Sequence, residues 1–556
     1  MRMSTDEDQD EEQALETIAA AAEAGITVFD TARAYGDNER LLAHGLRRAK
    51  SDDTARIVTK GGMSRAGGGW IPDGRAKAIR ADCEASLAAL DGLAIDLYLI
   101  HAPDPRTPWR TSVRALARLA DEGLARHIGL SNVNRVQLDE ALELAPVTAV
   151  QVALSPYDDQ ALRGGVVDRC ADKGIAVIAH SPLGGPRRAG RLARRQELVE
   201  IAEAQGTTPW EVTLTWLLQL SPAVVAIPGA RRPETARSAA RAASLRLEEG
   251  DRAALTEAFG EPRPAPRTRR RPADDAEVVL VVGIPGAGKS RVAEEYLARG
   301  YIRLNRDERG GTLRELAGAL DEELSSGARR FVLDNTYLTR AARSYVLDVA
   351  HRHGVPTRCV WLDTQLAQAQ VNLVERLLER FGSLPSPEEL RAVARREPGV
   401  HAPTSQMRTV RELEPPAADE GFASVEQLPF TRSTGSGRAG VFVAAAIFRE
   451  SDWKGAVEQG DRSAPHLVFD WKPGGAAEEP ADLASLLAAE VSGPVEVALC
   501  PHPAGPPTCW CRPPLPGLPL AFAREHGVDP SRSILLGTSP AHRTFATTLA
   551  ASYVAV

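Results

Sequence analysis

Cysteine is scarce in this sequence, with 6 among 556 residues. So few thiols exclude the disulfide-stapled scaffold of a small secreted domain. Long apolar runs are missing too, because no uninterrupted stretch approaches the ~20 residues that span a bilayer. The acidic segment from Asp6 to Glu12 is the opposite of the basic start of a signal peptide. We therefore predict a cytoplasmic protein without a membrane partner.

An excess of positive charge is also missing, since 67 basic residues face 74 acidic ones and the net charge is −7. Any nucleic-acid site must then be a local basic patch.

The length of 556 residues suggests about three domains of ~150–200 residues each. Two stretches lack an apolar face and are predicted linkers, one rich in Pro and Arg at 261–276 and one rich in Gly and Ser at 432–440. They divide the chain into domains at 1–260, 277–431 and 441–556.

A glycine-rich loop follows the apolar strand 278–282 and leads into a helical pattern, in the sequence GIPGAGKS. In this strand–loop–helix context the motif predicts a phosphate-binding loop for ATP and Mg²⁺, and disfavours a chance glycine-rich turn. Its glycines let backbone N–H groups converge on phosphate oxygens, the lysine reaches the β and γ phosphates, and the serine ligates magnesium. The predicted ATP-binding residues are Gly283, Gly286, Gly288, Lys289 and Ser290.

Short apolar strands alternate with helical patterns between Glu12 and Pro228. This alternation predicts parallel βα units, and seven or eight of them predict a closed (β/α)8 barrel. In that fold the chemistry lies at the carboxyl ends of the strands. The polar residues at those ends are Asp30, Lys60, His101, Ser131, Asn132, Gln151 and Ser181.

The motifs FDTARAYG, VTKGG, LIHAPDP, GLSN and IPGARRPE make this barrel resemble the aldo-keto reductases. The resemblance implies the catalytic tetrad Asp30, Tyr35, Lys60 and His101. Tyr35 would donate a proton to a small carbonyl substrate while hydride arrives from a nicotinamide, and Lys60, paired with Asp30, would lower the pKa of the phenol from ~10. His101 would orient the carbonyl.

The cofactor end of the barrel is expected to hold NADPH, through Ser131, Asn132, Gln151, Ser181 and Arg231. Arg232 and Arg237 add positive charge for a 2′-phosphate, although a solvated helix start is an alternative. Ser238 and Ala239 replace the Glu-Asn that the family often has. The initial MRMS resembles the end of the family's first strand, so this strand is expected to be missing, to lie upstream, or to be replaced by a neighbouring segment.

The middle domain resembles polynucleotide 5′-kinases of the end-healing type. The matching stretches are NRD at 305–307, LDNT at 333–336 and the closing run 402–430. The resemblance implies a partner nucleic acid, RNA or DNA, with a 5′-hydroxyl end. Asp307 would be the base that takes the hydroxyl proton. Acceptor contacts would come from Arg306, Asp334, Asn335 and Thr336. A small hydroxylated metabolite remains an alternative acceptor.

A lid that covers the phosphates is expected at 383–399, where Arg391, Arg395 and Arg396 fall on adjacent helical turns. Arg391 and Arg395 are taken as ATP-binding, and a solvated basic face is the alternative for each. Asp307 could instead cap the following helix, and Asn335 could serve only to shape a turn. Gly310 stands where some relatives have an arginine, and Arg309 is the expected substitute.

The last domain resembles the histidinol-phosphate and heptose-bisphosphate phosphatases of the haloacid dehalogenase-like superfamily, a small Rossmann-like fold, mainly over 511–556. The resemblance requires two aspartates, a lysine and metal-binding acids. These positions hold the residues Ala444, Ala446, Pro513, Thr538 and His542. Because no phosphoaspartate forms without a nucleophile, we predict an inactive pseudophosphatase.

Cys500, His502, Cys509 and Cys511 lie within twelve residues, with the spacing C-x-H-x6-C-x-C. Three thiolates and an imidazole can complete a tetrahedral zinc site, and unrelated cysteines are the alternative.

The sequence as a whole predicts an α/β protein in which a polynucleotide kinase-like domain follows an aldo-keto reductase-like barrel. Two rival hypotheses remain, a small-molecule kinase coupled to a carbonyl reductase, and outer domains that are non-catalytic scaffolds.

Overall fold

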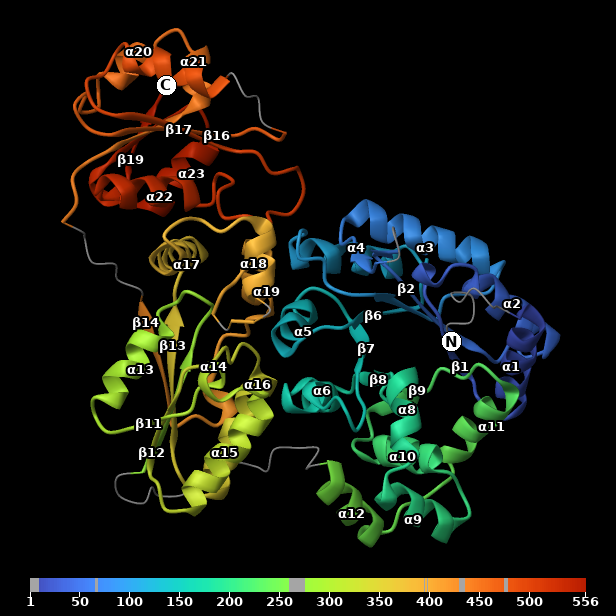
Figure 1. Cartoon of the computed structure of the whole chain (residues 1–556). Coiled ribbons are helices and arrows are strands. Elements are labelled where there is room, and N and C mark those ends of the chain that lie inside the picture. The colour runs from blue at the N-terminus through green and yellow to red at the C-terminus, as the bar shows by residue number, and fades with distance from the viewer. Residues whose placement is uncertain are drawn as a thin grey trace. The chain divides into compact units, whose positions relative to one another are not determined.

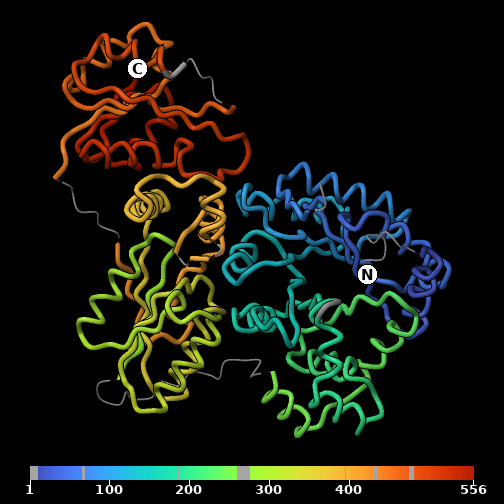
Figure 2. Tube along the Cα trace, viewed as in Figure 1, coloured from blue at the N-terminus to red at the C-terminus, as the bar shows by residue number. Residues whose placement is uncertain are grey.

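The computed structural model describes residues 10–65, 69–259, 276–394, 396–397, 399–429, 436–474 and 479–556. The chain divides into two compact units, one with strands β1 to β9 and one with strands β10 to β19. Each of the three main sheets is built from one continuous stretch of chain, and Figure 2 shows the course of the chain from blue to red. Most of the predicted linker 261–276 and part of the predicted linker 432–440 lie outside the described residues, so the domain limits stay predictions. No helix in the described ranges is long and apolar enough to cross a membrane.

Seven parallel strands form the first sheet, in the order β1-β2-β5-β6-β7-β8-β9. They are Val28–Asp30 (β1), Arg56–Gly61 (β2), Leu97–Ile100 (β5), His127–Ser131 (β6), Val147–Ala153 (β7), Ala176–His180 (β8) and Val224–Ile227 (β9). Helix α1 (Glu11–Glu23) precedes β1, and the helices that follow the successive strands are Asn38–Arg48 (α2), Ala76–Leu90 (α3), Trp109–Asp121 (α4), Arg135–Leu142 (α5), Val166–Lys173 (α7), Pro209–Gln219 (α10) and Pro233–Ala242 (α11).

The strands of this sheet are buried because helices cover them. Tyr98, Leu99 and Ile100 of β5, for example, are at most 1% exposed. The predicted barrel-like βα fold is confirmed, with seven strands among the described residues (Figure 1). Residues 1–9 lie outside those residues, so the prediction about the first strand is not tested. Since all strands run parallel, their carboxyl ends meet at one edge of the sheet.

The second sheet is also parallel, in the order β11-β12-β10-β13-β14. Its strands are Glu277–Val282 (β10), Ile302–Arg303 (β11), Arg330–Leu333 (β12), Thr357–Asp363 (β13) and Ser424–Pro429 (β14). The helices that carry its site are Lys289–Leu297 (α13), Arg306–Arg309 (α14), Leu366–Phe381 (α17), Pro387–Ala394 (α18) and Pro403–Glu412 (α19). The central strand β10 is the one that runs into the glycine-rich loop, as the sequence predicts.

The third sheet is parallel as well, in the order β17-β16-β15-β18-β19. Its strands are Val441–Ala444 (β15), His466–Trp471 (β16), Val495–Cys500 (β17), Ile534–Gly537 (β18) and Ser552–Ala555 (β19). Helices α21 (Glu479–Ala488), α22 (Gly517–His526) and α23 (Pro540–Leu549) belong to it. A strand order that moves outward in both directions from β15 is that of a doubly wound sheet.

Helix α17 belongs to two cores at once. Its apolar residues Val374, Leu377 and Leu378 are buried in one cluster with Leu520 and Leu549 of the third sheet's helices. Figure 1 shows α17 next to α22 accordingly. The C-terminal domain therefore packs directly against a helix of the P-loop domain.

Candidate functional site

The glycine-rich loop adopts the geometry that its sequence predicts. Gly286 has a φ of +86°, and a Cβ there would lie 2.2 Å from the carbonyl oxygen of Ala369. Only glycine fits such a position. Gly288, with a φ of +97°, is the N-cap of α13. The Lys289 ammonium donates to the carbonyl oxygens of Gly283 and Ile284, at 2.9 and 3.0 Å. A strand, this loop and a helix N-terminus together make a phosphate site.

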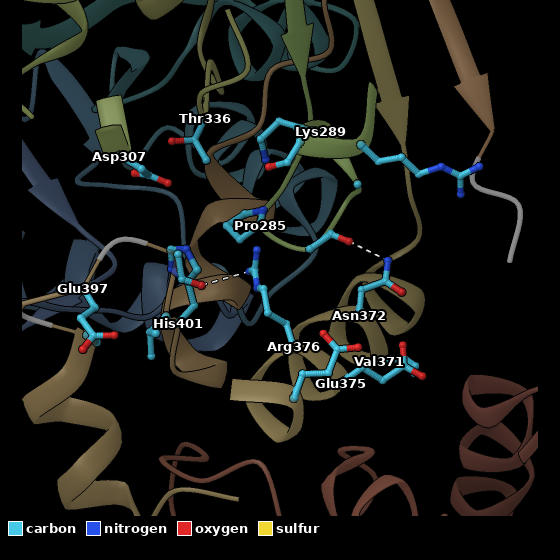
Figure 3. A pocket seen from close by; sticks show the side chains of 18 of the residues that line it. Pro285, Lys289, Asp307, Thr336, Val371, Asn372, Glu375, Arg376, Glu397 and His401 are labelled. Atoms are coloured by element: carbon cyan, nitrogen blue, oxygen red, sulfur yellow. Dashed lines mark hydrogen bonds between the residues drawn. The ribbon is translucent and has the colours of Figure 1, made fainter. Parts of the chain in front are cut away.

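A pocket of about 1440 Å³ opens in front of this loop. It brings together most of the residues predicted for the kinase site, among them Gly286, Gly288, Lys289, Ser290, Arg306, Asp307, Asp334, Asn335, Thr336, Arg391 and Arg396. Figure 3 shows Lys289, Asp307 and Thr336 around this space. The predicted Gly283 is not in the lining, and a Cβ added there would lie 3.3 Å from the Cβ atom of Leu362. Arg395 lies outside the described residues.

Asp307 lies in the first turn of α14, and Asn305 caps that helix. The side-chain oxygen of Asn305 accepts from the backbone N–H of Asp307 at 2.6 Å. The capping role considered for Asp307 is thus filled by Asn305. Burial lowers the pKa of Lys289, Arg376 and His401, and the negative charge of Asp307 opposes this effect in all three, which places its carboxylate near these groups.

Two residues of α17 reach the pocket without having been predicted. The amide of Asn372 donates to the Gly286 carbonyl at 2.8 Å, and the guanidinium of Arg376 donates to the Gly399 carbonyl at 3.0 Å. Burial lowers the pKa of Arg376 from its ordinary value, although the charge of Asp307 opposes this. The signal in the sequence is their i, i+4 spacing, which puts both on one face of a helix.

His401 is a third residue that the sequence did not single out. It lines the pocket beside Arg376 (Figure 3). Burial, together with the charges of Arg376 and Lys289, lowers the pKa of His401 to about 4. The imidazole is therefore neutral at physiological pH, which suits a group that lies among cations.

The two residues of the LDNT turn are held by the protein itself. Asp334 accepts hydrogen bonds from Arg303 at 2.9 Å and from Asn305 at 2.8 Å. Asn335 accepts from the backbone N–H of Arg306 at 2.7 Å and donates to the Leu304 carbonyl at 3.2 Å. Both side chains thus shape the chain before α14, and both also line the pocket, so their contact with an acceptor stays a prediction.

The arginines expected around the phosphates differ in where their side chains lie. Arg391 of α18 lines the pocket and pairs with Glu388 at 3.7 Å. Arg309 was expected to replace the arginine that some relatives have at the position of Gly310, and this stays a prediction. Arg309 pairs with Glu323 at 3.7 Å, whereas Gly310 lines the pocket. Short α14 turns the Arg309 side chain toward helix α15 (Leu313–Ser325).

Lys289 provides a pH test of the phosphate site. Burial lowers the pKa of this lysine from 10.5 to about 8, and Arg376 adds to the effect while Asp334 and Asp307 oppose it. Since the ammonium form meets phosphate, kcat/KM for ATP should fall as the pH rises through about 8. A pH–rate profile from pH 6 to 10 measures this. In Lys289→Arg the fall in kcat/KM above pH 8 should disappear, although the rate itself should be lower. A wild-type profile that stays flat through pH 9 would contradict the assignment.

In the barrel, the structure brings the predicted tetrad together at the carboxyl ends of the strands. Lys60 is fully buried, and its ammonium donates to Asp30 Oδ1 and to the Thr31 carbonyl, both at 2.6 Å. The rings of Tyr35 and His101 meet edge to face with centroids 5.7 Å apart, and the Lys60 nitrogen lies 5.4 Å from the centroid of the Tyr35 ring.

His101 is buried as well, and burial, with the nearby charge of Lys60, lowers its pKa to about 3. Its Nδ1 atom has no hydrogen-bond partner among the described residues. A neutral imidazole carries one N–H group, and such a group can orient a substrate carbonyl. Trp70, whose ring lies 5.7 Å from that of His101 and 6.0 Å from that of Tyr35, adds an aromatic wall that the sequence did not predict.

The residues expected to hold the nicotinamide cofactor follow neighbouring strands. Gln151 of β7 donates to Asp30 Oδ2 at 2.7 Å, so it supports the tetrad. Asn132 donates to the Ser131 hydroxyl at 3.1 Å, and its amide oxygen lies 3.0 Å from His180 Nε2. Ser181 follows β8 with a φ of +53°.

The three arginines expected near a 2′-phosphate lie around the start of α11. The Arg231 carbonyl accepts from Gln13 at 2.8 Å. Arg232 is the N-cap residue of α11, and Arg237 lies 3.9 Å from Glu23. The structure thus places all three on the segment that follows the barrel strand β9.

In the C-terminal domain, Ala444 ends β15, and Thr538 and His542 lie beyond the end of the adjacent strand β18. The backbone N–H of Thr538 donates to His542 Nδ1 at 3.2 Å. Ala446 follows in the turn after β15, and Pro513 lies in the loop before α22. Ala444, Thr538 and His542 therefore lie at one edge of the sheet and supply no carboxylate there.

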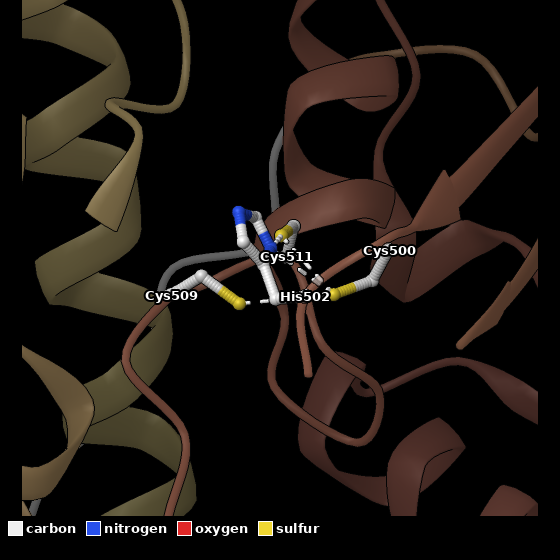
Figure 4. Close-up of side chains that lie close together, drawn as sticks. All are labelled: Cys500, His502, Cys509 and Cys511. Atoms are coloured by element: carbon white, nitrogen blue, oxygen red, sulfur yellow. Dashed lines mark hydrogen bonds between the residues drawn. The ribbon is translucent and has the colours of Figure 1, made fainter. Parts of the chain in front are cut away.

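The cysteine-rich loop brings its four predicted ligands together (Figure 4). All four ligand atoms lie within 4.8 Å of one another. Cys500 Sγ is 3.7 Å from Cys509 Sγ and 3.4 Å from Cys511 Sγ, and His502 Nδ1 is 3.4 and 3.2 Å from Cys500 and Cys511. Tetrahedral zinc, with Zn–S bonds of ~2.3 Å, places its ligand atoms roughly 3.5–3.8 Å apart. The separations of 3.2–3.7 Å found here are equal to or slightly shorter than these, and three thiols with one imidazole are a donor set that suits zinc. Cys83, Cys170 and Cys359 are buried elsewhere.

Comparison with known proteins agrees with this geometry. Residues 1–259 match the model of the aldo/keto reductase family, and residues 278–396 match a model described as an AAA domain. The aldo-keto reductase str7 of Strobilurus tenacellus is 29% identical over 276 residues, which cover 44% of this chain and 81% of that protein. An uncharacterized oxidoreductase of Schizosaccharomyces pombe is 32% identical over 246 residues, covering 44% of this chain and 78% of that protein. The chain therefore belongs to the aldo/keto reductase family through its N-terminal barrel, and an AAA-type P-loop domain follows that barrel.

Proposed function

We propose that the P-loop domain transfers the γ-phosphoryl group of ATP to the 5′-hydroxyl end of a polynucleotide. The observation that carries this proposal is the shared pocket of Asp307, Lys289 and Arg376. A phosphoryl transfer requires a base for the hydroxyl proton and cations for the charge on the transferred group. Asp307 can serve as the base, and Lys289 and Arg376 are the cations near the phosphate-binding loop.

In this mechanism the 5′-oxygen attacks the γ-phosphorus, the bond to the β–γ bridging oxygen breaks, and ADP leaves. Asp307 takes the hydroxyl proton. Lys289 and Arg376 offset the negative charge on the phosphoryl oxygens, and Asn372 holds the loop through the Gly286 carbonyl. Ser290, at the start of α13, would hold a bound magnesium, which adds positive charge at the phosphates.

Two features favour a polynucleotide over a small metabolite as the acceptor. The pocket of about 1440 Å³ exceeds the ~300–1,000 Å³ of ordinary small-molecule sites, so it has room for a second large substrate. Arg306, Arg391 and Arg396 lie in its lining, where they can meet a phosphate backbone. Acidic residues such as Glu308 and Glu397 lie in the same lining, so a phosphate backbone would meet individual arginines there.

The test is an incubation with γ-labelled ATP and matched 20-nucleotide RNA and DNA strands, each with either a 5′-hydroxyl or a 5′-phosphate. We expect label only on 5′-hydroxyl strands. A panel of hydroxylated metabolites distinguishes the alternative acceptor. Label on a metabolite and on neither nucleic acid would overturn the polynucleotide assignment.

For the barrel we propose NADPH-dependent reduction of a small carbonyl compound. The buried Lys60–Asp30 pair beside Tyr35 and His101 supports it, because this arrangement can hold a carbonyl oxygen next to a phenol. The cofactor, when bound, supplies the hydride, and Ser131, Asn132, Ser181 and Arg231 are the residues that would hold it. NADPH titration distinguishes this function from that of a non-catalytic scaffold, which would bind no cofactor.

For the C-terminal domain we propose an inactive phosphatase-like fold that holds a structural zinc ion. Metal analysis should find about one zinc per chain in the wild type and none in a Cys509→Ser/Cys511→Ser variant, because two thiolate ligands are then lost. Cys359→Ala is the control, since this cysteine lies in the P-loop sheet, and it should keep the zinc. Zinc retained by the double variant would contradict the site.

A further inference from the structure

Trp510 links the cysteine-rich loop to the phosphotransferase pocket. It lies between the two ligands Cys509 and Cys511, and it is only 1% exposed. Its ring belongs to the same buried cluster as Leu390 of α18 and Val400. Its indole N–H donates to the backbone carbonyl of His401 at 3.0 Å. A residue of the C-terminal domain thus holds the main chain of the segment that closes the P-loop pocket.

The segment 399–402 is held from two sides. Its residues line the pocket, and Arg376 donates to the Gly399 carbonyl from the α17 side. Trp510 holds the His401 carbonyl from the opposite domain. A movement of this segment would therefore displace both the His401 ring and the partner of the Arg376 guanidinium.

The C-terminal domain also supports the helix that carries Arg376. Gln368, in the first turn of α17, donates to the Thr548 carbonyl at 3.3 Å. The apolar face of α17 is buried against α22 and α23, while Asn372 and Arg376 point to the pocket from its other side. Residues of the C-terminal domain, Val528 and Leu549 among them, complete the pocket lining.

From these contacts we infer that the C-terminal domain is a positioning element of the phosphotransferase, in which Trp510 transmits the order of the zinc loop to His401 and Arg376. The inference rests on the proposed kinase function and on the proposed zinc. It explains why a fold without phosphatase acids can still matter to the activity. It also means that loss of metal from one domain impairs catalysis in the other.

The test compares Trp510→Phe with Trp471→Phe in the full chain. Trp510→Phe keeps the aromatic ring and removes the N–H donor to His401. Trp471 is a matched control, because its indole N–H donates to the His502 carbonyl at 2.8 Å, within the same loop and away from 399–402. Both proteins are assayed for zinc content, melting temperature, ATP affinity by calorimetry, and hydrogen exchange at the amides of 399–402.

We expect Trp510→Phe to keep its zinc, to exchange faster at 399–402, and to lower kcat for phosphoryl transfer about 3- to 10-fold, with a smaller change in KM for ATP. Trp471→Phe retains all four zinc ligands, so it should keep its zinc and leave exchange at 399–402 and kcat unchanged. Wild type stripped of zinc by a chelator and resupplied with Mg²⁺ should show the fast exchange, and added Zn²⁺ should reverse it.

Unchanged exchange in Trp510→Phe, or equal effects of the two substitutions, would overturn the inference. Hydrogen exchange and ATP affinity do not depend on the acceptor. If no oligonucleotide is phosphorylated but the exchange pattern is as expected, the polynucleotide proposal fails while the positioning role stands.

Discussion

Replacing Asp307 by Asn should lower phosphoryl transfer by about 10²- to 10⁴-fold, the usual contribution of a general base. The amide keeps the size of the carboxylate but cannot take the proton of the attacking hydroxyl. Asn305 caps α14 through the Asp307 N–H, which the substitution retains, so the helix should keep its place. ATP affinity, measured by calorimetry, should change by less than about threefold, because Lys289 and the loop still meet the phosphates.

The control for this variant is Glu295→Gln, which removes a carboxylate from an exposed position of α13 outside the pocket lining. It should transfer phosphate at the wild-type rate. If Asp307→Asn transferred label as fast as this control, Asp307 could not be the base. A parallel loss of ATP affinity would instead show that Asp307 acts by holding Lys289.

Tyr35→Phe should abolish carbonyl reduction in the barrel, with a fall in kcat of about 10²- to 10⁴-fold. The phenylalanine ring can keep the edge-to-face contact with His101, but no hydroxyl remains to donate a proton. NADPH binding should stay within about twofold, since the residues assigned to the cofactor follow other strands. NADPH oxidation with a panel of aldehydes and ketones measures the rate, and fluorescence titration measures the binding.

Tyr98→Phe is the matched substitution within the same barrel. The Tyr98 hydroxyl donates to the Ile79 carbonyl in the core at 3.1 Å, away from the tetrad. We expect a loss of about 1 kcal/mol in stability and an unchanged kcat. Equal activity of Tyr35→Phe and wild type would show that the barrel does not use this phenol as its acid.

The sequence alone was sufficient to assign functional residues that lie close together in the chain or at the ends of predicted strands. The phosphate loop is contiguous, so Gly286, Gly288 and Lys289 could be assigned from one short motif. The tetrad is not contiguous, but Asp30, Lys60 and His101 each lie at the end of a parallel strand, and such ends must meet at one edge of a sheet. The four zinc-loop residues lie within twelve positions, which limits how far apart they can be.

Tertiary structure alone decided which side chains fill the space between these elements. Arg376 and His401 come from a helix and a loop with no strand-end signal. Arg376 reaches the pocket from α17, which packs against the helices of the third sheet, and Trp510 holds the main chain at His401. Asp334 lines the pocket, yet Arg303 already bonds its carboxylate, and Arg309 pairs with Glu323. Trp510 could have been an ordinary core residue of its own domain. Such pairings depend on how domains pack, and local periodicity carries no information about contacts between segments distant in sequence.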